Sequence, residues 1–584
     1  MTERRPLGRP ADRRLLAGYG PGIFLACAFL LMALLVPTVA PAQNVAVQAQ
    51  NPGGAPGSSS GMQGSTASDV PGAAAAGGTA SGATAAGSAT SGSAGANGAA
   101  SGGAGRTSAA GGASGQAPTG RAAGCSGPQV KGDPYSPPCM SFSGSNGGAT
   151  SRGVTANQIV VTYRVPSDNI SSIDAAIQQL AGKYNQASFS DTAADVERTL
   201  QDLVTYFNDR FQFYGRKIVL QQYNGQGTLT AEITGGGQSQ ANSDALTVAD
   251  SLKAFADVSA LSQPYASALS GQHVVNIGAP YMSLPWFQQN APYAWSFFPN
   301  CTTATEGGAL VATRQVVTQK VTWAGTGVAD GQPRKFAVIA PDNPVYQSCI
   351  GIVTAAMAKA GHPVADNLTY TADLSQLSQE AASMEQRLVN DRITTVLCAC
   401  DPITLIYLTG DLDNASYEPE IINSGGAFTD EDLVSQLFDQ SVWAHAAGET
   451  FNGVTPPYGS SLGYFAAKSV DPGHQPAHEV DILYEDLYIL ALGIQLAGPD
   501  LTPQTFQRGL FSYGGGNGEY GPWSFQQGGQ GIWTPQYEFK YEWWNPKAVS
   551  PFNGQKGSWQ VSSNWYQFGQ IPTGAEPVFP NGPQ

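Results

Sequence analysis

Three groups of residues in this chain have types and spacings that suit catalysis or metal binding. The run Gly459-Ser460-Ser461-Leu462-Gly463 fits the G-x-S-x-G pattern, which presents a nucleophilic serine between a strand and a helix. The same pattern occurs at 57–61 within a stretch of small residues, and Ser461 follows Thr455-Pro456-Pro457 rather than a strand. The pattern therefore carries little information, and a secreted hydrolase using Ser461 is kept only as an alternative function.

The other two groups are candidate metal ligands. His474, His478 and Glu479 lie close together, but a proline interrupts them and they do not form an H-E-x-x-H helix, so we expect a surface loop. Cys398 and Cys400 supply two thiols, whereas a structural zinc site needs four donors and the sequence has no second close pair. We also find no phosphate-binding P-loop and no dinucleotide fingerprint. The sequence predicts no metal, no cofactor and no enzymatic activity.

Composition and charge narrow the class of protein. The chain has 584 residues and a formal net charge of -15, and only 12% of its residues are charged. A nucleic-acid partner is excluded because phosphate neutralisation requires clustered Lys and Arg, which this chain lacks. Because the first quarter is low in complexity, the folded part spans roughly 430 residues, enough for two large lobes.

The N-terminus has the pattern of an export signal. Several arginines precede the apolar run Gly22–Val36, and the small residues Ala40-Pro41-Ala42 follow it. We expect a signal peptide over residues 1–42 and an exported protein, located in the cell envelope or secreted. An uncleaved anchor is the alternative, and it would be the protein's one contact with a membrane.

Residues 43–150 form a predicted linker. From Asn51 to Gly124 the sequence is almost entirely Gly, Ala, Ser and Thr, which cannot bury enough apolar surface to offset the entropy cost of ordering. Cys125 and Cys139 lie in the Pro-rich segment at its end, and their short separation predicts a local disulfide. Among the later cysteines, Cys349 near a helix start could approach Cys398 or Cys400 near a strand end, and the pairing stays open.

Strand and helix patterns alternate through the rest of the chain. The first series comprises strands at 158–162, 217–222, 257–261 and 273–277, with helices at 196–211 and 243–255. The second series comprises strands at 335–340, 367–370, 394–400 and 420–423, with helices at 346–360 and 375–390. This alternation predicts an α/β protein with two parallel sheets, whose ligands bind beyond the carboxyl ends of the strands.

Several segments resemble type I periplasmic binding proteins of the leucine/isoleucine/valine class, which are substrate-binding components of ABC transporters. The similar segments, in chain order, are Gly153–Ile159, Tyr206–Asn208 with Tyr214–Lys217, Pro341–Tyr346, Tyr484–Ala497 and Pro499–Pro503. The resemblance covers residues 151–584. It implies two Rossmann-like lobes joined by a three-segment hinge, with lobe 1 at about 151–300 and 476–550, lobe 2 at about 301–475, and a Trp-rich wrap over about 521–584.

The resemblance also implies a function and a set of ligand-binding residues. In lobe 1 these are Ser262, Gln263, Gly278, Ala279 and Tyr281. In lobe 2 they are Tyr346, Asp401 and Ser424, and the segment that returns to lobe 1 adds Tyr484. The implied function is capture of a small polar organic ligand for an ABC transporter permease, with a ligand sensor for a signalling partner as the alternative.

Three of these assignments have a competing interpretation. Tyr281 and Tyr484 could be core aromatics, and Asp401 could cap the helix that begins at Pro402. Pro280 also removes a main-chain N–H donor after the fourth strand, which disfavours an amino-acid ligand.

Overall fold

The computed structural model describes residues 126–168, 191–233, 235–372, 374–452, 457, 459–477, 480–551 and 554–566. The expected signal segment, residues 43–125 of the linker with Cys125, and His478 with Glu479 lie outside these residues. No helix within the described ranges has both the length and the apolar character needed to span a bilayer.

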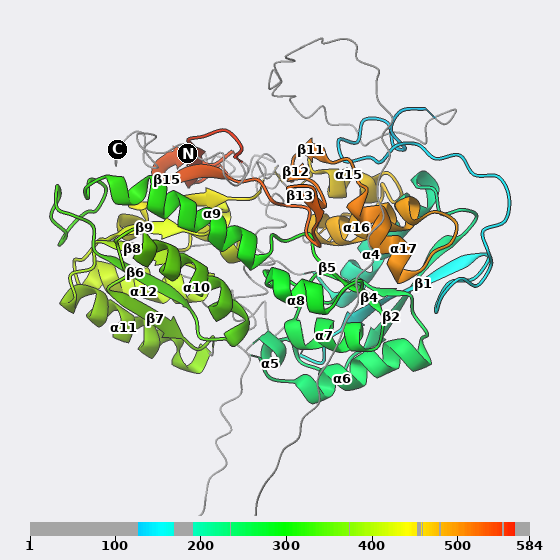
Figure 1. Cartoon of the computed structure of the whole chain (residues 1–584), viewed down its shortest axis with the longest axis horizontal. Helices are drawn as coiled ribbons and strands as arrows, with labels where there is room; N and C mark the ends of the chain where they lie inside the picture. The colour runs from blue at the N-terminus through cyan, green and yellow to red at the C-terminus, as the bar shows by residue number, and fades with distance from the viewer. Residues whose placement is uncertain are drawn as a thin grey trace, which may run out of the picture. The chain divides into compact units, whose positions relative to one another are not determined.

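The first sheet has five parallel strands in the order β2-β1-β3-β4-β5. Their bounds are β1 (Gln158–Val165), β2 (Lys217–Asn224), β3 (Ala256–Asp257), β4 (Val275–Ile277) and β5 (Ala294–Trp295). Two helices that pack together are α6 (Gln238–Leu246) and α7 (Gln263–Gly271), while α4 (Ala193–Arg210) packs with a later helix, α16 (Val480–Ala497) (Figure 1). A parallel sheet of this kind needs helical crossovers between its strands, and the sequence supplies them.

Helix α4 shows why the local sequence folds as it does. Thr192 caps its first turn, and the Asp195 side chain reaches back to the Thr192 amide, forming a capping box. Val196, Leu200 and Leu203 recur at helical spacing and are buried. The predicted helix at 196–211 is confirmed.

The second sheet has seven strands in the order β16-β15-β10-β9-β8-β6-β7. Their bounds are β6 (Phe336–Pro341), β7 (Asp366–Tyr370), β8 (Thr395–Cys398), β9 (Glu420–Asn423), β10 (Ala446–Thr450), β15 (Lys540–Val549) and β16 (Lys556–Val561). The strands from β6 to β10 are parallel, whereas β15 pairs antiparallel with β10 and β16 pairs antiparallel with β15. This sheet is therefore mixed, not purely parallel as predicted.

Helices cover both faces of the second sheet. Helices α9 (Cys301–Arg314) and α10 (Pro344–Lys359) pack together over one face, and α11 (Leu374–Asn390) and α12 (Pro402–Asn414) pack together over the other. Val338, Leu397, Ile422 and Ala447 are successive neighbours across four strands, and their side chains belong to the α9–α10 core. Because successive side chains of a strand point to opposite faces, this sheet contributes to two hydrophobic cores, one on each face.

The chain passes between the two sheets three times. It leaves the first sheet after β5 to form α9, and it returns after β10 to form α15 (Leu462–Lys468), α16 and α17 (Pro503–Phe511). It then enters the second sheet again as β15. Two α/β lobes joined by three segments are the fold of the type I periplasmic binding proteins, and the predicted fold class is confirmed.

Two boundaries differ from the sequence prediction. Residues up to 550 were assigned to lobe 1, but β15 adds to the second sheet because Tyr541 and Trp543 bury their rings in the α9–α10 core. The predicted helix 243–255 begins at Gln238 and ends in a short π-helical turn at Thr247–Ser251. The Trp-rich segment divides, because Trp523 packs on Tyr135 and Trp544 packs on Trp559.

The cysteine pairing also corrects an expectation. Cys301 is bonded to Cys349, and Cys398 is bonded to Cys400. A bond between Cys349 and Cys398 or Cys400 is therefore excluded, although Cys349 and Cys400 do line the same cavity. The sequence left the pairing of the four cysteines open because the predicted elements left residues 278–334 without a helix, and α9 occupies that gap.

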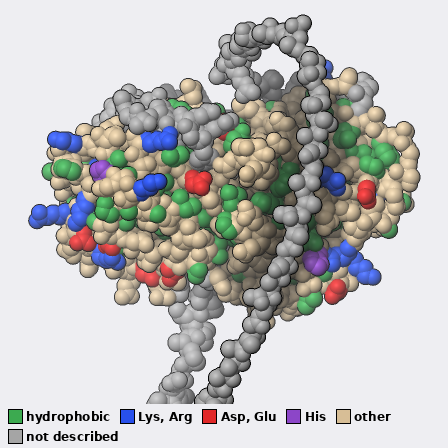
Figure 2. Space-filling model, viewed as in Figure 1, with side chains coloured by type: hydrophobic (Ala, Val, Ile, Leu, Met, Phe, Trp, Pro, Cys, Tyr) green, Lys and Arg blue, Asp and Glu red, His purple; other side chains and the backbone are tan. Residues whose placement is uncertain are grey.

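Charged side chains do not gather by sign on the face shown in Figure 2. Lys and Arg occur there among Asp, Glu and many uncharged polar groups. Such a surface favours solubility and gives a polyanion no basic stripe to follow.

Candidate functional site

An open cavity of about 130 Å³, here called the outer cavity, lies at the carboxyl ends of the second sheet. Its walls come from the N-terminal turns of α9 and α10 and from the loops after β4, β6, β7, β8 and β9. Strand β6 stands between β8 and β7, so the crossovers leave it in opposite directions. Such a switch point opens a crevice between adjacent loops, which is where open α/β sheets bind ligands.

Four of the nine predicted ligand-binding residues line the outer cavity. They are Tyr281, Tyr346, Asp401 and Ser424. Tyr281 comes from the first lobe and the other three from the second, so residues distant in the sequence reach one site. Sequence reasoning expected Cys349 and Cys400 near this cleft but did not place Asn343, Thr371 or Cys301 here, and all five line the same cavity.

Tyr281 connects the loops of the two lobes. It has a φ of 55°, in the left-handed region, just after β4. Its ring packs on Phe298 at 5.3 Å between centroids, and Phe298 packs on Phe428 at 5.8 Å. Burial raises the pKa of the Tyr281 phenol, and a hydrogen bond to the backbone of Ala427 opposes that shift. The phenol is therefore neutral at ordinary pH and bridges the loops after β4 and β9.

Tyr346 lies in the first turn of α10. The Asn343 side chain caps this helix by accepting from the Val345 amide at 3.0 Å, and Pro344 follows as its first residue. Burial raises the pKa of Tyr346 to about 12. The phenol keeps its proton at neutral pH and can donate a hydrogen bond.

Asp401 caps α12 as well as lining the cavity. Its Oδ1 accepts from the amides of Ile403 and Thr404 at 2.8 and 3.0 Å, and its Oδ2 accepts from the Thr404 hydroxyl at 2.6 Å. The capping role considered from the sequence is thus present. Because these bonds occupy the carboxylate, Asp401 has little remaining capacity to bind a ligand cation.

Ser262 and Gln263 lie at the first sheet but do not line the outer cavity. The Ser262 hydroxyl caps α7 and donates to Glu232, which forms a buried ion pair with Arg164. The Gln263 amide donates to Ser267 at 3.0 Å. These contacts give both residues a structural role in the described structure.

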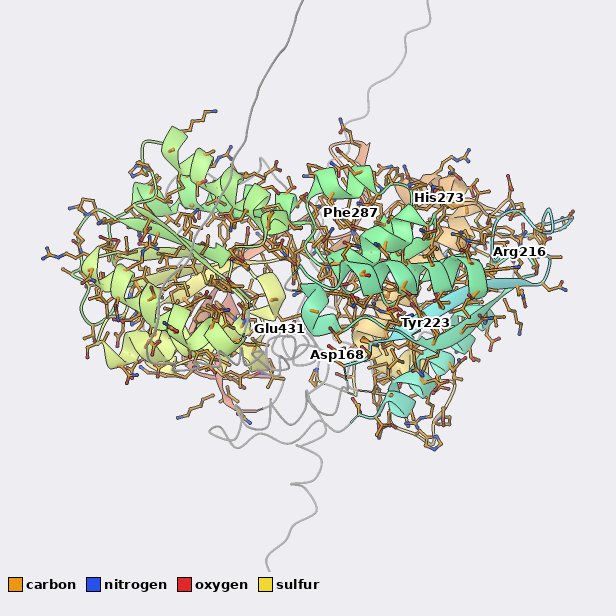
Figure 3. All side chains as sticks on the ribbon, turned by 90° about the horizontal axis from the view of Figure 1, so that it is seen from below. Asp168, Arg216, Tyr223, His273, Phe287 and Glu431 are labelled. Carbon is orange, nitrogen blue, oxygen red and sulfur yellow. A yellow bond between two sulfur atoms is a disulfide. The ribbon has the colours of Figure 1, made fainter. Side chains whose placement is uncertain are left out.

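Beside this ion pair lies a chain of buried hydroxyls. Tyr223, labelled in Figure 3, places its hydroxyl 2.6 Å from that of Tyr265, which donates to Asp257 at 3.0 Å. These hydroxyls therefore form a connected chain to Asp257, while Arg164 Nε beside them has no hydrogen bond.

The other three predicted residues are also outside the outer cavity. Gly278 adopts φ 124°, and Ala279 is fully buried. Tyr484 lies in the core, with ring centroids 5.4 Å from Phe207 and 5.5 Å from Tyr488. The core interpretation of Tyr484 fits this packing, and its role in ligand binding stays a prediction.

A second cavity, here called the inner cavity, has a volume of about 40 Å³ and shares Ala304, Thr305, Ile350, Ala399 and Ser424 with the outer one. Glu449 and Asn423 line it, at the carboxyl ends of β10 and β9. Sequence reasoning missed Glu449 because Ala446–Thr450 is rich in small residues and shows no apolar alternation. Only the pairing of β10 with β9 brings this residue to the site.

The two cavities are acidic or neutral in their lining. Neither Lys nor Arg lines either cavity, whereas Asp342, Asp401 and Glu449 do. Within the described ranges, no three His, Cys, Asp or Glu side chains form a group suited to a metal ion. The outer cavity can enclose the apolar part of a molecule. Its phenols can donate hydrogen bonds to a polar group of the same molecule.

The residues first considered for catalysis have structural roles. Ser461 is fully buried and caps α15 by accepting from the Tyr464 amide at 3.2 Å. His474 is exposed, with its Nδ1 2.6 Å from Asp471 Oδ2. Ser461 therefore does not stand at an exposed strand-to-helix turn.

Comparisons with known proteins give structural matches alone. No protein-family model and no curated protein matches the chain. The chain is similar to substrate-binding proteins of ABC transporters. A fatty acid ABC transporter substrate-binding protein from Thermomonospora curvata is 13% identical with a TM-score of 0.48, covering 72% of this chain and 97% of its own.

Two further matches are structures with a bound small molecule. A solute-binding protein from R. palustris in complex with 4-hydroxybenzoate is 11% identical with a TM-score of 0.48, covering 71% of this chain and 98% of its own. A substrate-binding protein from Desulfitobacterium hafniense in complex with Leu is 14% identical with a TM-score of 0.42, covering 69% of this chain and 99% of its own.

Proposed function

We propose that this protein is an extracytoplasmic solute-binding protein that captures a small organic molecule in the outer cavity and delivers it to an ABC transporter permease. The observation that carries the proposal is the position of the cavity, at the switch point of the second sheet with Tyr281 of the first lobe in its wall. Export rests on the N-terminal sequence alone.

The geometry suits binding by closure of two lobes. Tyr346 and Ser424 belong to the second lobe, and Tyr281 approaches them from the first. A ligand that contacts both sides interacts better with the closed arrangement than with an open one, and this difference in affinity drives closure. Three connecting segments supply the hinge.

The test is to identify what the protein carries. The purified protein is denatured, and the released small molecules are identified by mass spectrometry and then titrated back by calorimetry. We expect a stoichiometric organic molecule whose affinity falls when Tyr281 or Tyr346 is replaced by alanine. Binding that is insensitive to both replacements would place the site elsewhere, and turnover of the molecule would favour the hydrolase alternative.

A further inference from the structure

Glu449 is a buried carboxyl that makes no hydrogen bond of normal geometry, although the backbone of Gly308 lies near it. Its residue is 2% exposed, and neither Oε1 nor Oε2 has a hydrogen bond. Its side chain lies on the same face of β10 as Ala447, within the apolar layer under α9 and α10. Gly308 of α9 leaves room for it, because a Cβ at Gly308 would stand 3.2 Å from Glu449 Oε1.

This placement is costly unless something else binds there. An unpaired carboxyl in an apolar layer loses its hydration without compensation, so such groups are rare in folded proteins. Burial raises the pKa of Glu449 well above its usual range, and the nearby charge of Asp430 raises it further, although the Gly308 backbone opposes the shift. Burial therefore favours the neutral form of Glu449, which has one O–H donor and a carbonyl acceptor.

Asn423 supplies a second unsatisfied group in the same cavity. It is 2% exposed, its Oδ1 accepts from the Thr429 hydroxyl at 2.8 Å, and its Nδ2 has no hydrogen bond. The inner cavity thus offers an N–H donor from Asn423 and a donor and an acceptor from Glu449. A group that both accepts and donates hydrogen bonds complements this set.

Deepening the proposed function on which it rests, we propose that the inner cavity is the head-group subsite of the ligand site and binds an uncharged carboxamide or hydroxyl group. The apolar body of the same molecule then lies in the outer cavity, whose volume of about 130 Å³ suits one ring. Anionic head groups are disfavoured because no Lys or Arg lines either cavity, whereas Asp342 and Asp401 line the outer cavity.

An isosteric series tests the charge of the head group on the full chain. Benzamide, benzamidinium and benzoate have nearly the same shape and carry charges of zero, plus one and minus one. Calorimetry should rank benzamide first, with heats that do not depend on the ionisation enthalpy of the buffer. Benzamidinium would need Glu449 to ionise and release a proton, and benzoate would meet the carboxyls of Asp342 and Asp401 without any cation to balance its charge. Tighter binding of either ion, or no binding of benzamide up to its solubility limit, overturns the proposal.

Variants separate this subsite from the outer cavity. Glu449→Met should weaken benzamide binding by about tenfold or more, because it removes both hydrogen bonds, and Glu449→Gln should recover most of that loss. Glu306→Gln, at an exposed position of α9, is the matched control. Melting curves verify that each variant is folded.

The losses of benzamide affinity in the two variants distinguish a failure of the subsite proposal from a failure of the proposed function. Benzamide binding that falls in Tyr346→Ala but not in Glu449→Met overturns the subsite, leaves the outer cavity as the site, and means that water fills the inner cavity. Binding that is unchanged in both variants overturns the subsite and the proposed function together.

Discussion

Cys301 and Cys349 are joined by a disulfide that connects the first turn of α9 to the second turn of α10, with 5.9 Å between their Cα atoms. Both residues line the outer cavity. The bond fixes two walls of the cavity to each other, so binding and stability of the second lobe are linked through it.

Replacing both Cys301 and Cys349 with serine should destabilise the protein. The bond closes a loop with a sequence separation of 48 residues. The chain-entropy estimate for such a loop is about 4 kcal/mol of unfolding free energy. Equilibrium denaturant unfolding measures the loss.

The matched control is replacement of Cys398 and Cys400, whose separation is only 2 residues. The loss there should be much smaller, because so short a loop restricts the unfolded chain little. Equal losses for the two pairs would contradict the entropic explanation. Non-reducing peptide mapping of the wild type tests both bonds, and with them the Cys125–Cys139 bond, which stays a prediction.

Tyr346→Ala should lower the affinity for the co-purified molecule by one to two orders of magnitude, roughly 1.4 to 2.8 kcal/mol. The reason is the loss of a neutral phenol donor and an aromatic wall of the outer cavity. Calorimetric titration measures the change. Tyr484→Phe is the comparison in the core, where the affinity should not change. Wild-type affinity in folded Tyr346→Ala would remove Tyr346 from the site.

Glu232→Gln should destabilise the first lobe without changing ligand affinity. Arg164 donates two hydrogen bonds to Glu232, each of 2.7 Å, and also contacts Asp244 at 3.1 Å. All three side chains are almost completely buried. Breaking such a pair leaves a buried charge poorly compensated and costs about 3 kcal/mol.

The exposed pair of Arg198 and Asp195 gives the control for this prediction. Arg198→Gln should change the unfolding free energy by less than about 1 kcal/mol, because water screens the pair. If Glu232→Gln and Arg198→Gln had equal effects on denaturant unfolding, the buried pair would not hold this lobe together.

Ionisation of the Asp481 carboxyl should lower the free energy of unfolding as pH rises. Burial raises the pKa of Asp481 to about 6, although hydrogen bonds from Tyr520, Ser461 and Gly463 lower it. The folded state therefore holds a proton that the unfolded state releases near pH 4, so this contribution is complete below that pH and is lost as pH rises to about 6.

Comparison with Asp481→Asn isolates this carboxyl from other buried acids. Between pH 4 and pH 7 the difference in unfolding free energy should shift in favour of the variant by roughly 3 kcal/mol, the equivalent of about two pKa units. Unfolding at a series of pH values measures it. A difference that does not vary with pH would show that Asp481 titrates normally.

The sequence by itself determined the layered architecture and part of the site. Strands such as Gln158–Thr162 and Glu420–Asn423, and helices such as Val196–Phe211, have local periodicities that survive in the fold because each element buries one face. Tyr346 and Asp401 were named as ligand-binding residues from the family resemblance, and both follow strands of the second sheet, a position that local order along the chain defines.

Only the tertiary structure decided which side chains meet. The local sequence around Tyr484 does not distinguish a tyrosine that faces a ligand from one that lies in a core. The packing of α16 on α4 places its ring beside Phe207 and Tyr488. Glu449 reaches the inner cavity because β10, which has no apolar alternation, pairs with β9. Cys301 meets Cys349 because α9 packs against α10. Each of these contacts depends on the pairing of elements distant in sequence, which residue periodicity does not encode.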